Sequence, residues 1–144
     1  MTITKLALIA TATVAATIAL PATLQAATAG SFQSPTGNIV CLMGTGDDGK
    51  SRVDCEIADH TWLAPPRSPD CPLNWGSRFR LEQGSAAVFA CYHQVLTTPE
   101  QTLDYGQTRS AGTLTCDSEP SGITCTDSST GHFFRVSRGS YQLG

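Results

Sequence analysis

The chain has 144 residues and a formal net charge of −3, from nine basic and twelve acidic side chains. This weakly acidic balance argues against a nucleic-acid-binding protein, which needs a basic face, and against binding to an anionic membrane surface. The chain has six cysteines, eight prolines and thirteen glycines and little helical periodicity. This composition indicates a small cross-linked domain that is rich in turns.

The first 26 residues are expected to form a secretory signal peptide. Lys5 precedes an apolar run over residues 6–20 that contains no charged side chain. Small residues follow, so a signal peptidase would cut after Ala26 or, alternatively, after Ala29. A retained membrane anchor is the less favoured alternative, because a transmembrane helix needs ~20 apolar residues. We therefore expect no stable membrane insertion after cleavage, and a single disulfide-rich β domain over residues 30–144.

The cysteines form an even set in a short exported chain, which is typical of a disulfide framework. They are Cys41, Cys55, Cys71, Cys91, Cys116 and Cys125. Closing a loop of about 15 residues contributes roughly 3 kcal/mol in the chain-entropy model, so three bridges would stabilise a domain with a modest aromatic core. Disulfides persist in oxidising compartments, so we expect a secreted or periplasmic bacterial protein.

Apolar and polar residues alternate in short runs separated by turn-forming residues, which predicts an antiparallel all-β domain. In chain order, the residues that share the predicted buried faces are Ile39, Cys41 and Met43; Val53, Cys55 and Ile57; Phe79 and Leu81; Val88, Phe89 and Cys91 of a more buried strand over residues 86–93; Leu114 and Cys116; Ile123 and Cys125; and Phe134 and Val136. We expect a small disulfide-stabilised sandwich or partly open barrel of about six or seven short strands.

One segment carries a local helix signal. Thr98 is a possible N-cap, Pro99 suits the first helical position and Gln101 suits the third, and Gly106 would end the helix. We therefore expect at most one or two helical turns here, serving as a connection between strands.

Two cysteine-bearing segments resemble each other and predict two cross-linked hairpins. Each has a glycine, an apolar residue and a cysteine, then a turn, then an apolar residue and a second cysteine. In register, the paired cysteines lie on the same face of each hairpin, which predicts Cys41–Cys55 and Cys116–Cys125 and leaves Cys71–Cys91. Six cysteines allow fifteen pairings. Either duplication or convergence on a common hairpin explains the likeness.

An ordered series of residues over nearly the whole expected mature chain resembles a family of small secreted bacterial domains of uncharacterised function. The series comprises Phe32, Ser34, Pro35, Thr36, Gly37, Asn38, Ile39 and Cys41; Asp54, Cys55 and Ile57; Trp62, Pro65, Pro66, Arg67, Cys71, Trp75 and Gly76; Gly84 and Cys91; Leu103, Tyr105 and Gly106; Gly122, Ile123 and Cys125; and Thr130, Gly131, His132, Phe134, Val136, Ser137 and Arg138. Residues 92–94 and Phe133 depart from it. The resemblance implies secretion and a disulfide-bonded fold, and it implies no reaction.

No specific catalytic, metal-binding or cofactor motif is present, so we expect no catalytic residue, metal or cofactor. The chain has no H-E-x-x-H, G-x-S-x-G or C-x-x-C motif. The candidate binding residues are His132, Arg135, Trp62 and Arg67. His132 is expected to be a hydrogen-bonded structural residue that shares a face with Phe134. Arg67, Arg135 and Arg138 would rim an anion site if the fold brings them together.

The proline-rich segment 63–69 follows Trp62 and has two interpretations. It is either a recognition surface for a partner or a rigid crossover loop held by Cys71, with Trp62 packed beneath it. We favour the crossover loop. Trp75 is expected to belong to the core.

Three functions fit these observations. The leading hypothesis is a non-enzymatic exported module that binds an envelope or extracellular protein or a small molecule. The second is a small envelope enzyme that uses His132 with a nearby carboxylate. The third is an inhibitor of an exogenous hydrolase that presents an exposed loop such as residues 44–50.

Overall fold

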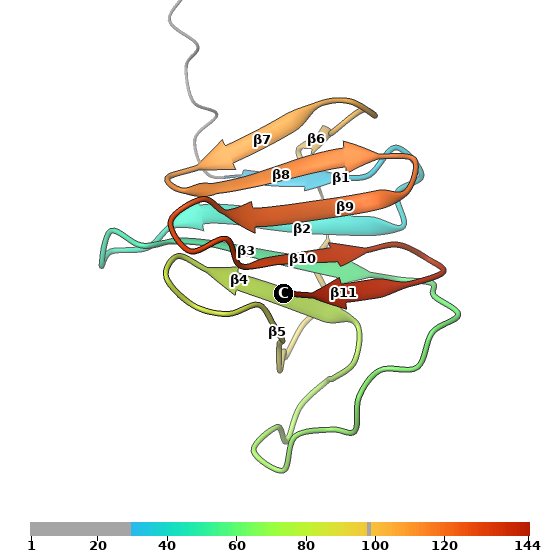
Figure 1. Cartoon of the computed structure of the whole chain (residues 1–144). Helices are drawn as coiled ribbons and strands as arrows, with labels where there is room; N and C mark the ends of the chain where they lie inside the picture. Colours follow the sequence, from blue (N-terminus) through green and yellow to red (C-terminus); the bar gives the residue numbers. More distant parts are fainter. Residues whose placement is uncertain (1–29, 98) are drawn as a thin grey trace, which may run out of the picture.

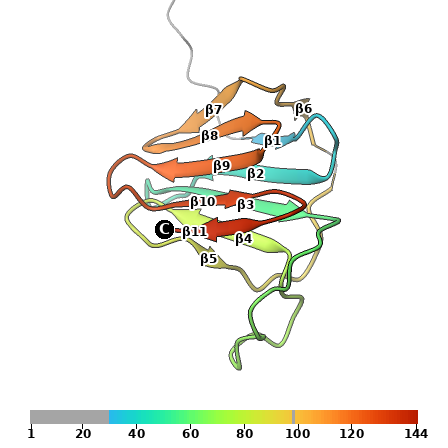
Figure 2. The ribbon, with the colours of Figure 1, turned by 45° about the vertical axis from the view of Figure 1, so that its right-hand side comes forward.

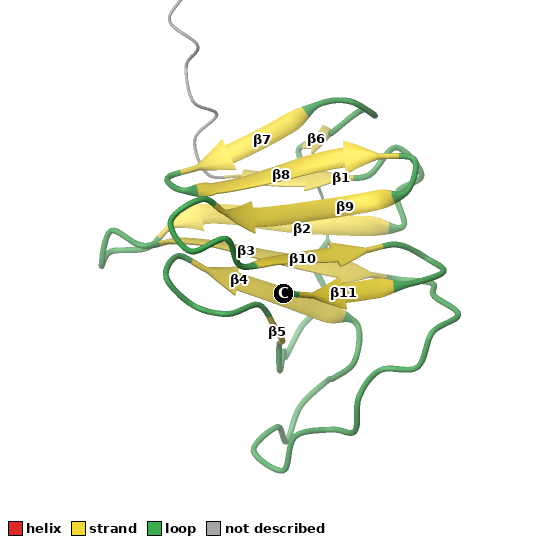
Figure 3. Cartoon of the chain, in the orientation of Figure 1, coloured by secondary structure: helices red, strands yellow, loops and turns green. Residues whose placement is uncertain are grey.

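The computed structural model describes residues 30–97 and 99–144, which form two β-sheets packed face to face (Figure 1). The expected signal peptide and both expected cleavage positions lie outside the described residues. No described residue is in a helix (Figure 3). Accordingly, no described segment forms a helix of the length and apolarity needed to cross a membrane.

The six-stranded sheet has the order β5-β4-β3-β2-β1-β6, and the five-stranded sheet has the order β11-β10-β9-β8-β7. The strands are β1 (Gly30–Gln33), β2 (Ile39–Thr45), β3 (Ser51–Ile57), β4 (Arg78–Glu82), β5 (Val88–Phe89), β6 (Gln101–Thr102), β7 (Thr108–Ala111), β8 (Leu114–Glu119), β9 (Gly122–Asp127), β10 (Phe133–Val136) and β11 (Tyr141–Leu143). All pairings are antiparallel except β1 with β6. The all-β sandwich is confirmed, and the sheets do not close into a barrel.

The eleven strands exceed the expected six or seven because several edge strands are too short to show alternation in the sequence. The strands without a counterpart among the predicted ones are β1 and β7, with four residues each, β6 with two and β11 with three. Tertiary pairing with a longer neighbour defines them, as in the pairing of β7 with β8. An isolated two-residue segment carries no periodic signal.

The predicted apolar faces form the core between the sheets. Phe32, Phe79 and Phe134 are fully buried, as are nearly all the other alternating apolar residues of the central strands. Two antiparallel sheets exclude water from their inner faces in this way, with side chains from both sheets interdigitating. Val88 is an exception among the predicted buried residues, because it is 47% exposed on the outer face.

All three predicted disulfides are confirmed, and no described cysteine is free. Cys41–Cys55 joins β2 to β3 and Cys116–Cys125 joins β8 to β9, at directly opposed positions of each hairpin. The two similar hairpins lie in opposite sheets, and the Sγ atoms of Cys55 and Cys125 are 4.0 Å apart. Because disulfide sulfurs carry no hydrogen, this is a packing contact. Each bridge therefore joins two strands of its own sheet, and the two bridges pack against each other at the centre of the core.

No helical turn forms over the described residues 99–106, and Thr98, the expected N-cap, lies outside the described residues. Gln101 and Thr102 form β6, which pairs with β1 in parallel. The backbone N–H of Leu103 donates to the carbonyl of Gln33 at 2.9 Å, and the Leu103 side chain is buried. Sheet pairing and burial thus override a local capping signal worth about 1 kcal/mol.

The expected strand over residues 86–93 is also shorter in the structure, where β5 spans only Val88–Phe89. The N–H of Ala90 still donates to the Arg78 carbonyl at 2.8 Å; beyond Ala90 the chain leaves the sheet, and Cys91 forms its disulfide with Cys71. Tyr92 then pairs with Asn74 as an isolated bridge. The covalent link therefore directs this segment toward the long loop between β3 and β4.

Candidate binding surface on the loop between β3 and β4

Residues 58–77 form a long loop that projects beyond both sheets (the β3–β4 loop, green, at the bottom of Figure 1). The same projection is seen after a 45° turn (Figure 2). Because β3 and β4 are antiparallel neighbours, a hairpin turn of two to five residues would suffice to join them. Unstructured loops longer than about 12–15 residues are uncommon in small domains and are often functional.

Trp62 fixes the start of this loop against the sandwich. Its ring stacks on the His60 ring with centroids 3.7 Å apart and makes edge contacts with Phe79 and Tyr141. The indole Nε1–H donates to the carbonyl of Ser137 at 2.9 Å. This arrangement places Trp62 as an anchor beneath the loop, with little of its ring available to a ligand.

The far part of the loop is held by a second tryptophan and by a disulfide. Trp75 Nε1–H donates to the Pro65 carbonyl at 3.0 Å, and Cys71 is bonded to Cys91. The N–H of Cys71 also donates to the Ser68 carbonyl at 2.9 Å. Proline restricts its own φ to about −65°, so the segment between these anchors has few conformations available.

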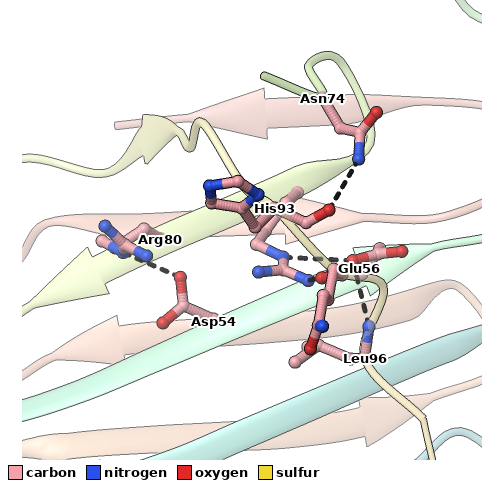
Figure 4. Close-up of polar contacts among 8 residues, drawn as sticks. Asp54, Glu56, Asn74, Arg80, His93 and Leu96 are labelled. Atoms are coloured by element: carbon pink, nitrogen blue, oxygen red, sulfur yellow. Dashed lines mark hydrogen bonds and ion pairs between the residues drawn. The ribbon is translucent and has the colours of Figure 1, made fainter. Parts of the chain in front are cut away.

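The ion pair between Arg78 and Glu56 on the outer face of β3 and β4 braces the segment that carries Cys91 (Figure 4). Arg78 donates to Glu56 through Nε at 3.1 Å, and a second nitrogen of Arg78 donates to the Gln94 carbonyl. Glu56 in turn accepts from the N–H of Leu96 at 3.4 Å. Arg78 and Glu56 are nearly buried, so these charge-assisted bonds are only weakly screened by salt.

Two further contacts complete this brace. The Asn74 side chain donates to the His93 carbonyl at 3.0 Å (Figure 4), and the Arg78 guanidinium lies 4.2 Å from the centroid of the Tyr92 ring. Asn74 belongs to the β3–β4 loop and the other residues do not. The loop is therefore tied to the sheet through residues 91–96 as well as through its own ends.

The loop exposes Leu63 and Arg67 to solvent. Leu63 is 90% exposed, whereas the other exposed large apolar side chains, among them Leu42 and Val95, are between 47% and 58% exposed. Arg67 is also exposed, and it makes no ion pair with another described residue. Leu63 was not among the candidate binding residues predicted from the sequence. Its exposure could have been predicted from the inward-facing Trp62, because neighbouring side chains of an extended chain point to opposite sides.

The remaining candidate residues lie elsewhere and have separate partners. His132 is half-buried, and its Nδ1 lies 3.2 Å from the carbonyl oxygen of Gly144. Arg135 is exposed on β10 and donates to the Thr124 hydroxyl at 3.0 Å. The structure therefore brings neither residue to the β3–β4 loop.

The structure does not bring together the three arginines that were expected to rim an anion site. Arg138 pairs with Asp59 at 3.0 Å, with both side chains about two-thirds exposed. Arg135 bonds Thr124 and Arg67 lies on the projecting loop, so the three arginines have different surroundings. Within the described part of the chain, no group of three or more His, Cys, Asp or Glu side chains is arranged to hold a metal.

Two clefts lie outside the projecting part of the β3–β4 loop, although Asp59 at the start of the loop lines the second of them. One, of about 500 Å³, lies at the β2–β3 turn and is lined by residues that include Asp48, Lys50 and Glu82. The other, of about 400 Å³, is lined by residues from both sheets that include Tyr105 and Glu119. None of His132, Arg135, Trp62 and Arg67 lines either cleft.

The β2–β3 turn at residues 44–50, the loop considered for an inhibitor, is closed by its own hydrogen bonds. Gly46 N–H donates to the Lys50 carbonyl at 2.9 Å and Gly49 N–H donates to the Gly46 carbonyl at 3.0 Å. The Asp48 carboxylate accepts from the N–H of Lys50 at 3.0 Å. The turn exposes charged side chains and no large apolar one.

Comparison with known proteins gives a family and no closer relative. Residues 12–143 match the model of a family described as a family of unknown function, DUF6636. No curated protein and no solved structure matches the chain. Since the match spans most of the chain, the protein belongs to the DUF6636 family.

Proposed function

We propose that the protein is an exported, non-enzymatic module that binds a partner protein in the periplasm or outside the cell through its β3–β4 loop. The observation that carries the proposal is the 90% exposure of Leu63 on a loop that a disulfide and two tryptophan hydrogen bonds hold in place. Three disulfides in so small a domain support the proposed location, because disulfides form and persist in oxidising compartments.

The physical advantage of this arrangement is pre-organisation. Binding normally costs about 0.5–1.5 kcal/mol for each flexible side chain that is immobilised, and more for an ordered loop. Here the anchors of Trp62 and Trp75 have already reduced the freedom of the loop backbone. Burial of one leucine against a partner contributes about 1.5–3 kcal/mol. A rigid, partly apolar loop therefore keeps more of its contact energy as net affinity than a flexible loop would.

Replacing Leu63 with serine is expected to weaken partner binding at least about tenfold, because it removes about 1.5–3 kcal/mol of apolar burial. The purified protein is immobilised and used to capture proteins from an envelope extract, with quantification of each retained protein. Leu42→Ser is the matched control, since Leu42 is 48% exposed on β2, away from the loop.

The expected result is at least one protein that both the original chain and the Leu42→Ser variant retain and the Leu63→Ser variant loses. Equal retention of every captured protein by all three forms would contradict the proposal. Thermal unfolding of the variants checks that each is folded, and an exposed leucine is expected to change stability by less than about 0.5 kcal/mol.

A further inference from the structure

We infer that the β3–β4 loop binds in the substrate cleft of a serine protease that cleaves after basic residues, with Arg67 in the primary specificity pocket. This inference rests on the proposed function and names the class of partner. Arg67 is exposed and makes no ion pair with another described residue. A protease of this class carries a buried carboxylate in its pocket, and a guanidinium binds a carboxylate through two parallel hydrogen bonds.

The backbone is braced on both sides of Arg67. On the N-terminal side, the Pro65 carbonyl accepts from Trp75 Nε1 at 3.0 Å. On the C-terminal side, the Ser68 carbonyl accepts from the N–H of Cys71 at 2.9 Å. Arg67 therefore lies between two residues whose carbonyls are fixed to the rest of the protein.

The prolines around Arg67 favour the extended backbone that a protease cleft accepts. Pro66 restricts its own φ and biases Pro65 toward extended conformations, and Pro69 does the same for Ser68. Leu63–Ser68 contains no helix or turn. A rigid extended segment loses little conformational entropy on binding, which is why pre-organised protease complexes form with little backbone movement.

The same braces explain why such a loop would inhibit a protease rather than be consumed by it. Attack of the protease serine oxygen on the Arg67 carbonyl carbon breaks the Arg67–Ser68 C–N bond. The serine proton passes through the catalytic histidine to the Ser68 nitrogen, and an ester forms between Arg67 and the protease.

The two new chain ends would remain near each other. The Ser68 amine is held by the Cys71–Cys91 disulfide and the Cys71 N–H bond, and the Arg67 end is held through Pro65 and Trp75. The amine can therefore attack the ester and restore the peptide bond before water reaches it, which regenerates the serine hydroxyl. Slow release of this kind makes a bound loop an inhibitor.

The test is inhibition of trypsin by the oxidised protein, measured with a small chromogenic substrate, with chymotrypsin as the protease of different specificity. We expect trypsin to be inhibited, and Arg67→Ala to raise the inhibition constant at least about 100-fold, the effect of losing a central charged contact. Arg67→Lys should retain inhibition. Arg135→Ala is the matched control, because Arg135 is an exposed arginine on the opposite sheet.

Three outcomes would overturn the inference: no inhibition of trypsin, inhibition that Arg67→Ala leaves unchanged, or rapid complete cleavage after Arg67 by mass spectrometry. Thermal unfolding confirms that each variant is folded. If trypsin is not inhibited but envelope proteins are still captured in a Leu63-dependent way, the protease inference fails and the proposed function stands. If Leu63-dependent capture also fails, both are contradicted.

Discussion

Replacing Asp127 with asparagine is expected to lower the free energy of unfolding by about 3 kcal/mol. The carboxylate is fully buried and accepts hydrogen bonds from Gly84 N–H at 2.7 Å, the Thr113 hydroxyl at 2.7 Å, and Ser129 N–H at 2.9 Å. These donors come from three different turns. Bonds to a charged acceptor contribute about 1.5–3 kcal/mol each. Asparagine keeps one acceptor oxygen but loses the charge, and its NH2 group would face a donor in place of the second oxygen.

Asp127 therefore joins the turns that follow β4, β7 and β9, in both sheets. Urea unfolding with the disulfides intact measures the loss. Asp117→Asn is the matched control, because Asp117 lies in the same sheet on β8 and is only partly buried. It should change stability by less than about 0.5 kcal/mol. Equal stability of the Asp117 and Asp127 variants would show that the network contributes nothing.

The Asp127 contribution is also expected to depend on pH. Burial alone would raise the pKa of Asp127, but the hydrogen bonds from Gly84, Thr113 and Ser129 outweigh it and hold the pKa well below its usual value of 3.8. A carboxyl group with a lowered folded-state pKa stabilises the fold fully above its unfolded-state pKa and loses that contribution as the pH falls below it. The stability difference between the original chain and Asp127→Asn should therefore be constant above pH ~5 and shrink below pH ~4.

Removal of the Cys41–Cys55 disulfide by alanine substitution is expected to destabilise the protein by about 2–5 kcal/mol. This bridge is fully buried at the centre of the core. The Sγ atom of Cys55 lies 4.0 Å from the Sγ atom of Cys125, which belongs to the bridge in the other sheet. Its loss removes a constraint on the unfolded chain and also leaves a cavity between the sheets, which adds a packing cost.

The matched comparison is the double alanine variant that lacks the Cys71–Cys91 disulfide. Chain entropy alone predicts a slightly larger effect there, because its sequence separation is 20 against 14 for Cys41–Cys55, a difference of about 0.3 kcal/mol. The cavity cost at the core bridge is larger than that, at roughly 1 kcal/mol or more. We therefore expect the Cys41–Cys55 variant to be the less stable of the two in urea unfolding, and the reverse order would refute this ranking.

The sequence predicted the core and the two hairpin disulfides because both depend on local patterns, and Cys71–Cys91 followed as the remaining pair. Alternation placed Cys41 and Cys55 on the inner faces of adjacent strands, and the short spacing between Cys116 and Cys125 permitted one register for a tight hairpin. Each of these signals is contained within about fifteen residues, which is the range over which periodicity is informative.

The parts that the sequence did not predict depend on distant contacts. The helix signal near Pro99 was overridden by pairing of β6 with β1, about 70 residues away. The Asp127 network was invisible because its donor Gly84 lies 43 residues earlier in the chain. The inward-packed Trp62 implied that Leu63 faces outward, but the position of Leu63 on the projecting loop depends on the hydrogen bonds of Trp62 and Trp75.

Pre-organised binding requires the β3–β4 loop to be rigid before any partner binds. The direct measurement is the backbone ¹⁵N order parameter of the free oxidised protein at Leu63, Ala64, Arg67 and Ser68, since the prolines between and after them have no amide hydrogen. We predict values near ~0.85, equal to those of β3 and typical of rigid backbone. Values below ~0.6 at these residues, with the Cys71–Cys91 bridge intact, would contradict a pre-organised binding loop.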